Sequence, residues 1–525
     1  MNRIKPIVLA IVDGWGIAPL GKSNAISEAQ TPHIDKFISE YPVMSLFGSG
    51  QALGLRDGEF GNSHVGHLNI GAGRICYHML TRIHMAILDG SFFQNKTLVG
   101  ACAYVSSTSG AVHIIGMLSD SGFHGDIAHI YALLKLAEQE GISKVYVHVI
   151  LDGETIAPTR GLEFVRALEV YMKELGVGEI ASVSGRYFAM DRDGHWERTG
   201  LAYRAIVEGI STHMVLGAVD AIEASYAEGI YDTKIIPTVI AQDGKPIGAV
   251  LEGDAVIFST VSSDRMRQLT QAVVLPHFSK FERMYLKNLE VVTMSMYEKE
   301  LPVFAAFRPL TVFNSLPQVI SKAGLRQLHI AETEKYADIT YFLNGNIDEP
   351  FEEESRILIS SPEVSSYDKT PQMAAHRITT DAIRAVNADT YHAIFVNYTN
   401  LDSVARTGNM SATIKACEYI DKMLGALSEY VRAKDGVLCI TASVGGAEEM
   451  YETSDGVARG SIGKNPVPFI IVSDAYRGIS SHAGDPFNGD LSLVKPAGLL
   501  ADVAPTFLKL LGVGKPEEMT GRVLV

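Results

Sequence analysis

The residues with the clearest chemical potential lie in the segment GEFGNSHVGH, at positions 58–67. Within it Ser63 stands between Gly61 and Gly66, where a helix or tight turn is expected to begin. A serine at a helix N-terminus faces free backbone N–H groups and the positive end of the helix dipole, which suits a transferring phosphoryl group. Its hydroxyl still needs a base or a metal ion as activator. Taken alone, such a serine is also a common helix N-cap.

An α/β framework is predicted to position this serine. Short apolar runs each end in a polar residue and precede a helical stretch, at residues 7–12, 112–118, 145–151, 255–258, 393–396 and 437–440. Continuous apolar strands that alternate with helices indicate a mostly parallel sheet covered on both faces. Ligands bind such sheets beyond the carboxyl ends of the strands, where Asp13, Asp152 and Asp402 fall. A polar residue at that place can also simply begin a loop.

Bulk properties exclude several classes of protein. A chain of 525 residues exceeds one hydrophobic core, so two or more domains are expected. The net charge of −15 argues against a nucleic-acid-binding surface and against a polybasic membrane anchor. The four cysteines have no zinc-site spacing, and the apolar run 6–12 is too short for a signal peptide or a membrane span. We therefore expect a cytoplasmic protein, monomeric, with reduced thiols.

Further motifs follow one another along nearly the whole chain. They are VDGWG at 12–16, GNS at 61–63, VGHLNIGAGR at 65–74, SDSGFH at 119–124, GRYFAMDRD at 185–193, EKY at 334–336, TGN at 407–409, NPVP at 465–468 and DVAPT at 502–506. Together they resemble the cofactor-independent (2,3-bisphosphoglycerate-independent) phosphoglycerate mutases of the alkaline-phosphatase superfamily. In that family a serine activated by two manganese ions takes the phosphoryl group of 3-phosphoglycerate and returns it to the 2-hydroxyl, a step of glycolysis.

The resemblance implies a discontinuous arrangement of domains. A phosphatase-like α/β domain with a mostly parallel sheet would comprise residues 1–78 and 312–525. An α/β phosphotransferase domain that binds substrate would be inserted at residues 79–311.

The metal site that the resemblance implies is degenerate. Of its seven ligand positions, three keep a ligand, namely Asp13, Ser63 and Asp402, and the other four are occupied by Arg406, Ser443, Val444 and Ile462. Manganese prefers oxygen and imidazole donors, whereas valine and isoleucine side chains offer no lone pair and arginine brings a fixed positive charge. We therefore predict that bound manganese is absent or weak.

The substrate contacts implied by the resemblance are better kept. Matching residues are His124, Arg186, Arg192, Arg265 and Lys335. However, Glu154 and Thr155 replace a family arginine and aspartate, and Ser262 replaces another arginine. Because Glu154 would repel an anion where arginine would hold it, affinity for a phosphorylated small acid is expected to fall.

Two functions remain open at this point. The first is a catalytically impaired or inactive paralogue with a binding or regulatory role, and the alternative is a working mutase with an atypical metal site. A metal-free serine hydrolase would need a His/Asp pairing around Ser63 that the sequence does not reveal. We also expect that Arg406 and Lys464 either enter the pocket, to neutralise Asp13 and Asp402, or point to solvent.

Overall fold

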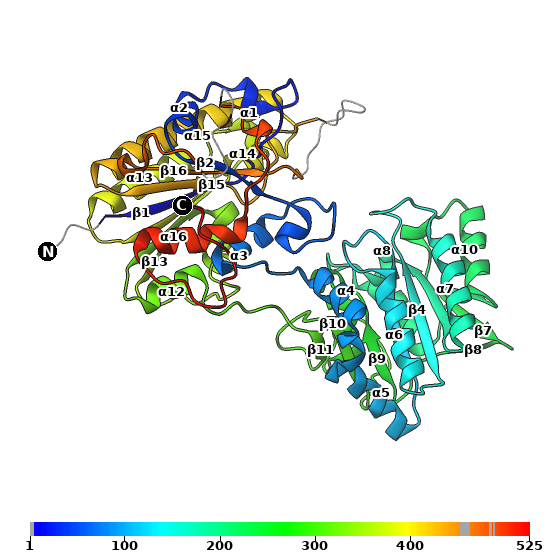
Figure 1. Ribbon diagram of the computed structural model, residues 1–525. Coiled ribbons are helices and arrows are strands. Elements are labelled where there is room, and N and C mark those ends of the chain that lie inside the picture. Colours follow the sequence, from blue (N-terminus) through cyan, green and yellow to red (C-terminus); the bar gives the residue numbers. More distant parts are fainter. Residues whose placement is uncertain (1–4, 452–462, 482–485, 487–488) are drawn as a thin grey trace. The chain divides into compact units, whose positions relative to one another are not determined.

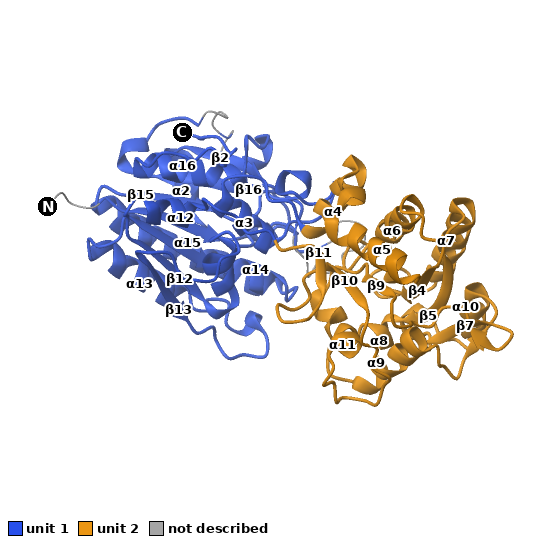
Figure 2. Ribbon diagram, turned by 90° about the horizontal axis from the view of Figure 1, so that it is seen from below, with its two compact units in different colours: residues 1–78, 310–525 blue, residues 79–309 orange. Residues whose placement is uncertain are grey.

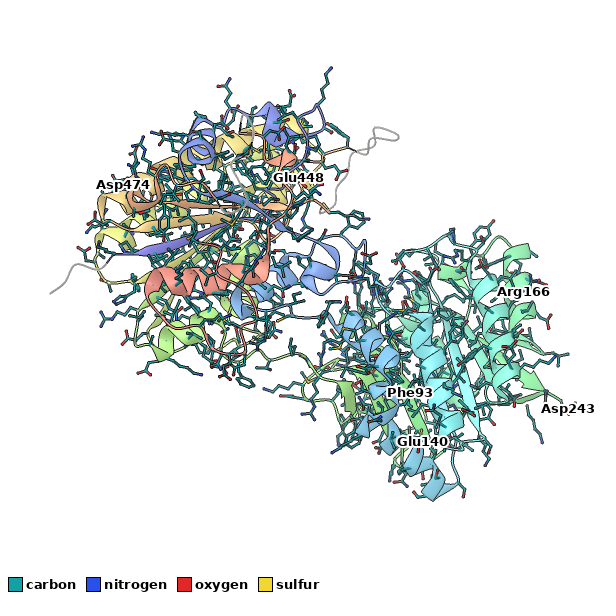
Figure 3. All side chains as sticks on the ribbon, viewed as in Figure 1. Phe93, Glu140, Arg166, Asp243, Glu448 and Asp474 are labelled. Atoms are coloured by element: carbon teal, nitrogen blue, oxygen red, sulfur yellow. The ribbon has the colours of Figure 1, made fainter. Side chains whose placement is uncertain are left out.

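The computed structural model describes residues 5–451, 463–481, 486 and 489–525. The chain forms two compact units, one made of residues Met1–His78 and Leu310–Val525 and the other of residues Met79–Pro309 (Figure 2). Each unit has its own sheet and its own apolar interior, filled by side chains from both sides of the sheet (Figure 3).

The first unit, called unit 1, contains an eight-stranded sheet with the order β13-β12-β14-β1-β15-β16-β2-β17. The strands are β13 Glu354–Ile359, β12 Gln327–Glu332, β14 Ala393–Tyr398, β1 Ile7–Val12, β15 Val437–Thr441, β16 Val467–Val472, β2 Val43–Phe47 and β17 Gly498–Leu499. Strands β13 to β15 are parallel, and β16 runs antiparallel to both of its neighbours. The central strand β1 is apolar and buried at all of its residues because sheet partners flank it and helices cover both faces.

Two layers of helices enclose this sheet (Figure 1). One layer contains α1 Ala25–Glu28, α2 Pro32–Glu40, α13 Ala375–Asn387, α14 Asn400–Ala405 and the long α15 Met410–Ala433. The opposite layer contains α3 Ser63–Ala72, α12 Leu316–Lys322 and α16 Val503–Leu511, which pack against one another. The carboxyl ends of β12, β14, β1 and β15 therefore lie at one edge of the sheet, next to the start of α3.

The second unit, called unit 2, contains a nine-stranded sheet with the order β11-β10-β9-β3-β4-β5-β7-β6 and β8 paired to β7. Its strands are β11 Phe304–Phe307, β10 Glu290–Ser295, β9 Ala255–Phe258, β3 Val112–Leu118, β4 Val145–Leu151, β5 Glu179–Gly185, β7 Thr238–Gln242, β6 Met214–Val215 and β8 Lys245–Pro246. Strands β11 to β5 are all parallel.

Helices cover both faces of the second sheet as well. One face packs against α4 Met79–Asp89, α5 Lys96–Thr108, α6 Ile127–Gln139, α7 Gly161–Leu175 and α10 Ala218–Ala227. The other face packs against α8 Arg186–Ala189, α9 Trp196–Tyr203 and α11 Ser263–Val274 (Figure 2). Within the described residues no helix combines the length and apolarity needed to cross a membrane.

The predicted α/β class with a mostly parallel sheet is confirmed. The runs expected as strands at 7–12, 112–118, 145–151 and 255–258 coincide with β1, β3, β4 and β9, while β14 and β15 are slightly longer than expected. Agreement is this close because each strand is a continuous apolar run that ends at a polar residue.

Apolar packing fills the interior of both units. Both interiors consist of aliphatic and aromatic side chains, and the four cysteines are buried and free. We therefore expect thermal unfolding, followed by circular dichroism, to have the same midpoint with and without excess EDTA. A large fall in the midpoint, or loss of cooperative unfolding in EDTA, would contradict a metal-independent fold.

Candidate functional site

Ser63 is the first residue of α3 and is buried. The side chain of Asn62 caps the helix by accepting a hydrogen bond from the Val65 N–H at 3.2 Å. Gly66 permits the close approach of α3 to the loop after β15, because a Cβ atom there would lie 2.5 Å from the backbone oxygen of Ser443. Local capping and one small residue thus place the Ser63 hydroxyl at the edge of the sheet.

Asp13 and Asp402 lie together at the ends of the neighbouring strands β1 and β14. The backbone N–H of Asp402 donates to the backbone oxygen of Asp13 at 2.9 Å. The carboxylate of Asp13 is fully buried: its Oδ1 accepts from the Ser443 backbone N–H at 3.1 Å and from the Ser443 hydroxyl at 2.5 Å. Its Oδ2 accepts from Asn397 Nδ2 at 3.0 Å. Two acidic groups therefore share one buried edge.

Lys335 places its ammonium among these groups. Its Nζ lies 2.6 Å from Ser63 Oγ, 3.0 Å from Asp402 Oδ2 and 3.5 Å from Asp13 Oδ2. Burial alone would lower the pKa of Lys335, but Asp13 and Asp402 outweigh it and raise that pKa well above its usual range. Burial likewise opposes ionisation of Asp13, yet His67 and Lys335 hold its pKa well below normal. Both groups are charged at neutral pH.

Asp338 and His67 complete the surroundings of Ser63. Asp338 begins a π-helical turn three residues after Lys335, and the Ser63 hydroxyl donates to its Oδ1 at 3.0 Å. In His67, Nδ1 lies 2.9 Å from the backbone oxygen of Ser63, and Nε2 lies 3.1 Å from Asn397 Nδ2. A carbonyl oxygen can only accept, so Nδ1 carries a proton and donates it to this oxygen. The sequence patterns do not predict a role for Asp338. Its position three residues after Lys335 could have suggested that the two side chains lie close together.

Arg406 does not lie between the two aspartates. Its guanidinium binds Asp402 alone, with Nε 2.9 Å from Oδ1 and Nη2 3.1 Å from Oδ2, and 47% of its side chain is exposed. Of the two alternatives left open by the sequence, Arg406 follows neither fully: it is half-exposed and pairs with Asp402 but not with Asp13, because a residue four positions after Asp402 at the end of α14 reaches that carboxylate alone. Lys464 is exposed, with its ammonium 4.5 Å from the centre of the Phe60 ring.

The loop that carries Ser443 and Val444 is fixed by a buried acid. Glu448, labelled in Figure 3, accepts hydrogen bonds from the Gly16 and Gly446 backbone N–H groups at 3.1 and 2.6 Å. Burial raises the pKa of this carboxyl despite these bonds. The backbone oxygen of Val444 accepts from the Gly14 N–H at 2.9 Å, and its side chain is completely buried. Val444 is therefore part of the packing and offers no side-chain donor.

These residues do not fit two divalent cations. Both oxygens of Asp402 already bind cationic side chains. The side chain of Val444 has no lone pair, and the Ser443 hydroxyl donates a hydrogen bond to Asp13. Ile462 lies outside the described residues. Among those described, three acidic or histidine side chains are spaced to hold a metal ion only in unit 2, where Asp191 already accepts bonds from His195 and Arg198.

The remaining predicted residues gather in unit 2, at the carboxyl ends of β3, β4, β5 and β9. Arg186 is buried and its Nη1 donates to Asp152 at 2.6 Å. Its Nη2 lies 2.9 Å from both His124 Nε2 and Glu154 Oε2. Glu154, which was expected to repel an anion, therefore forms an ion pair with the Arg186 guanidinium that would bind that anion.

The other two arginines of this cluster differ in availability. Arg192 is half-exposed and pairs with Asp264 at 2.6 Å. The Nε atom of Arg265 is buried without a hydrogen-bond partner in the described part of the chain. Burial and the neighbouring Arg186 and Arg265 lower the pKa of His124 to about 4, so its ring is neutral. The three carboxylates pair with Arg186 and Arg192, so Arg265 is the guanidinium group best placed to hold an anion.

Known proteins match the chain over its full length. A family model described as the BPG-independent PGAM N-terminus (iPGM_N) matches residues 83–299. The chain is 44% identical over 522 residues to the 2,3-bisphosphoglycerate-independent phosphoglycerate mutase of Clostridium perfringens, covering 99% of each protein. The Moorella thermoacetica protein of the same description is also 44% identical, covering 99% of this chain and 98% of the relative. A crystal structure of Leishmania mexicana phosphoglycerate mutase at low cobalt concentration aligns with a TM-score of 0.67 and 27% identity, covering 100% of this chain and 98% of that one.

The exposed pairing of Arg406 predicts a modest contribution to stability. We expect Arg406→Ala to lower the free energy of unfolding by about 1 kcal/mol, because solvent screens the pair and Lys335 still neutralises Asp402. Urea denaturation in a Trp196→Phe background measures this, since Trp15 then reports on unit 1 alone. The control Arg477→Ala removes an exposed pair with Glu40 and should cost less than about 0.5 kcal/mol. A loss of about 3 kcal/mol or more for Arg406→Ala would show that it supports a buried carboxylate.

The contact between Glu154 and Arg186 predicts a gain in anion binding. Glu154→Gln should tighten binding of 3-phosphoglycerate by roughly tenfold, because it frees part of a charge-assisted fork. Isothermal titration calorimetry provides the measurement. Glu163→Gln, which makes the same charge change at an exposed position of α7, is the control. Equal tightening in both variants would mean that only net charge matters.

Proposed function

The chain belongs to the 2,3-bisphosphoglycerate-independent phosphoglycerate mutase family, and we propose that it is a catalytically impaired member that retains a binding or regulatory role. The ligand class is a phosphorylated small acid, as in the reaction named for its relatives. The observation that carries the proposal is the pairing of Arg406 with both oxygens of Asp402. The family resemblance assigns both positions to metal ligands.

The charges around Ser63 support the loss of turnover. Three carboxylates, those of Asp13, Asp338 and Asp402, face two cations, those of Lys335 and Arg406, which leaves a formal charge of about −1. A phosphoryl group brings further negative charge to this edge. Without a compensating cation, its approach to the Ser63 oxygen is unfavourable.

Proton transfer from Ser63 is also poorly served. Lys335 lies closest to the hydroxyl, but its raised pKa keeps it protonated, so it cannot accept the serine proton. His67 already carries its Nδ1 proton, which points to a backbone oxygen. The carboxylates of Asp338 and Asp13 are left as acceptors, at 3.0 and 3.4 Å from the hydroxyl oxygen, and a carboxylate is a weak base towards a hydroxyl.

A binding role draws support from unit 2. His124, Arg186, Arg192 and Arg265 lie together at one edge of its sheet, and the Nε of Arg265 has no partner within the described residues. We propose that a phosphorylated acid binds there, more weakly than in an active relative, because carboxylates already hold Arg186 and Arg192. The free, buried cysteines favour a reducing, cytoplasmic location, and we propose that the chain acts as a monomer without nucleic-acid or membrane partners.

The alternative function is a working mutase with an atypical site. One observation favours it: Ser63 keeps its place at the start of α3, where it accepts from Lys335 and donates to Asp338. Such a hydroxyl is well oriented, and the ammonium could stabilise an alkoxide. This alternative predicts turnover that needs no added metal.

Turnover and metal content, measured on the same preparation, separate the two. We expect conversion of 3-phosphoglycerate to be roughly a thousandfold or more below that of the Clostridium perfringens relative, because several kcal/mol of metal-derived stabilisation is missing. Elemental analysis should find well under one manganese per chain. Ser63→Ala sets the background rate.

Three results would contradict the proposal. One is near-stoichiometric, tightly held manganese, and another is turnover comparable to that of the relative. The third is restoration of manganese-dependent turnover by Arg406→His alone, because Ser443, Val444 and Ile462 would still stand in place of the family's metal ligands. Turnover in EDTA that Ser63→Ala abolishes would instead support the alternative.

A further inference from the structure

We propose that the ammonium of Lys335 is the built-in counter-ion of the Asp13–Asp402 pair and that unit 1 depends on it to stay folded. Its removal should leave a site that accepts a small primary ammonium ion. The inference concerns how unit 1 stays folded and does not depend on whether mutase turnover remains.

Two carboxylates buried at one edge create a need for positive charge. Asp13 is 0% and Asp402 4% exposed, and their backbones are joined by a hydrogen bond between neighbouring strand ends. Burial of an ionised carboxylate without a partner is strongly unfavourable, and two close together also repel each other. The sheet can carry both in the ionised form only if a cation lies close to them.

Among the described side chains, Lys335 is the one that meets this need. Its Nζ is the cationic atom within 4 Å of oxygens from both aspartates. His67 Nε2 also approaches Asp13 Oδ2, at 3.8 Å, but the second carboxylate near its ring is that of Asp338 and not that of Asp402. Arg406 reaches Asp402 only.

The shape of the site matches an ammonium group. Three oxygen atoms surround Nζ, those of Ser63, Asp402 and Asp13, and an ammonium has three N–H groups to direct at them. The side chain is 9% exposed, so it comes from within the protein rather than across the surface. The turn Thr333–Lys335, directly after β12, delivers it to the carboxyl ends of β14 and β1. A cation tethered in this way cannot dissociate or be chelated.

The decisive variant is Lys335→Met, which removes the terminal ammonium and its charge but keeps most of the apolar stem of the side chain. In the Trp196→Phe background, where Trp15 reports on unit 1, we expect the thermal midpoint to fall by roughly 10 °C. Lys434→Met is the matched control, since it breaks a lysine–aspartate pair with the half-exposed Asp389 and should shift the midpoint by about 2 °C or less. Equal midpoints for Lys335→Met and its parent would overturn the proposal.

Chemical rescue tests the identity of the missing group. Methylammonium chloride should raise the midpoint of Lys335→Ala, because the truncated side chain leaves room for the ion, which can donate to the same oxygens. Tetramethylammonium chloride at equal concentration has no N–H group and should not, and neither salt should affect the parent protein. Equal stabilisation by both salts would reveal a general effect of ionic strength and would contradict the proposed ammonium site.

A second variant keeps the test decisive if Lys335→Met fails to fold. Lys335→Met combined with Asp402→Asn removes one of the two carboxylates that the ammonium neutralises. If the pair is the source of the instability, the double variant folds or melts above Lys335→Met. A double variant that is no more stable than the single one would show that Lys335 acts through its packing, and the proposal would be wrong.

Discussion

The burial of two carboxylates at the ends of adjacent parallel strands is the constraint on which unit 1 depends. Asp13 follows β1, Asp402 follows β14, and the parallel pairing of these strands brings both acids to one edge. The apolar strands cannot pair without this juxtaposition, so its electrostatic cost is part of the fold. Lys335, Ser443 and Asn397 offset that cost with one charge and several hydrogen bonds.

The same principle operates with opposite sign in unit 2. There a guanidinium, that of Arg186, is buried at the ends of parallel strands, and Asp152 and Glu154 surround it. Each unit thus satisfies its own buried charges with its own side chains. Asp402 in unit 1 and Arg186 in unit 2 are consequently held by side chains of the protein itself.

Much of the fold followed from local patterns. Continuous apolar runs identified β1, β3, β4 and β9 with their bounds, because burial on both faces leaves no alternation to obscure a strand. The order of motifs identified the family, which the relatives then established. The helix start near Ser63 was also readable from the flanking glycines, but the residue that caps the helix is Asn62 and not Ser63.

The sequence by itself determined the α/β class, the strand ends that bear Asp13 and Asp402, and the missing donor at Val444, since these depend on residue type and short-range pattern. Only the tertiary structure decided which cationic side chain neutralises the buried carboxylates. Arg406 is closer to Asp402 along the chain, but from its position at the end of α14 its side chain pairs with Asp402 only. Lys335 lies 272 residues from Ser63 and meets it only because β12 pairs beside β14 in the sheet. The contacts of Asp338 with Ser63 and of Glu154 with Arg186 were likewise decided by packing, since pairing between buried charges depends on distance in space rather than along the chain.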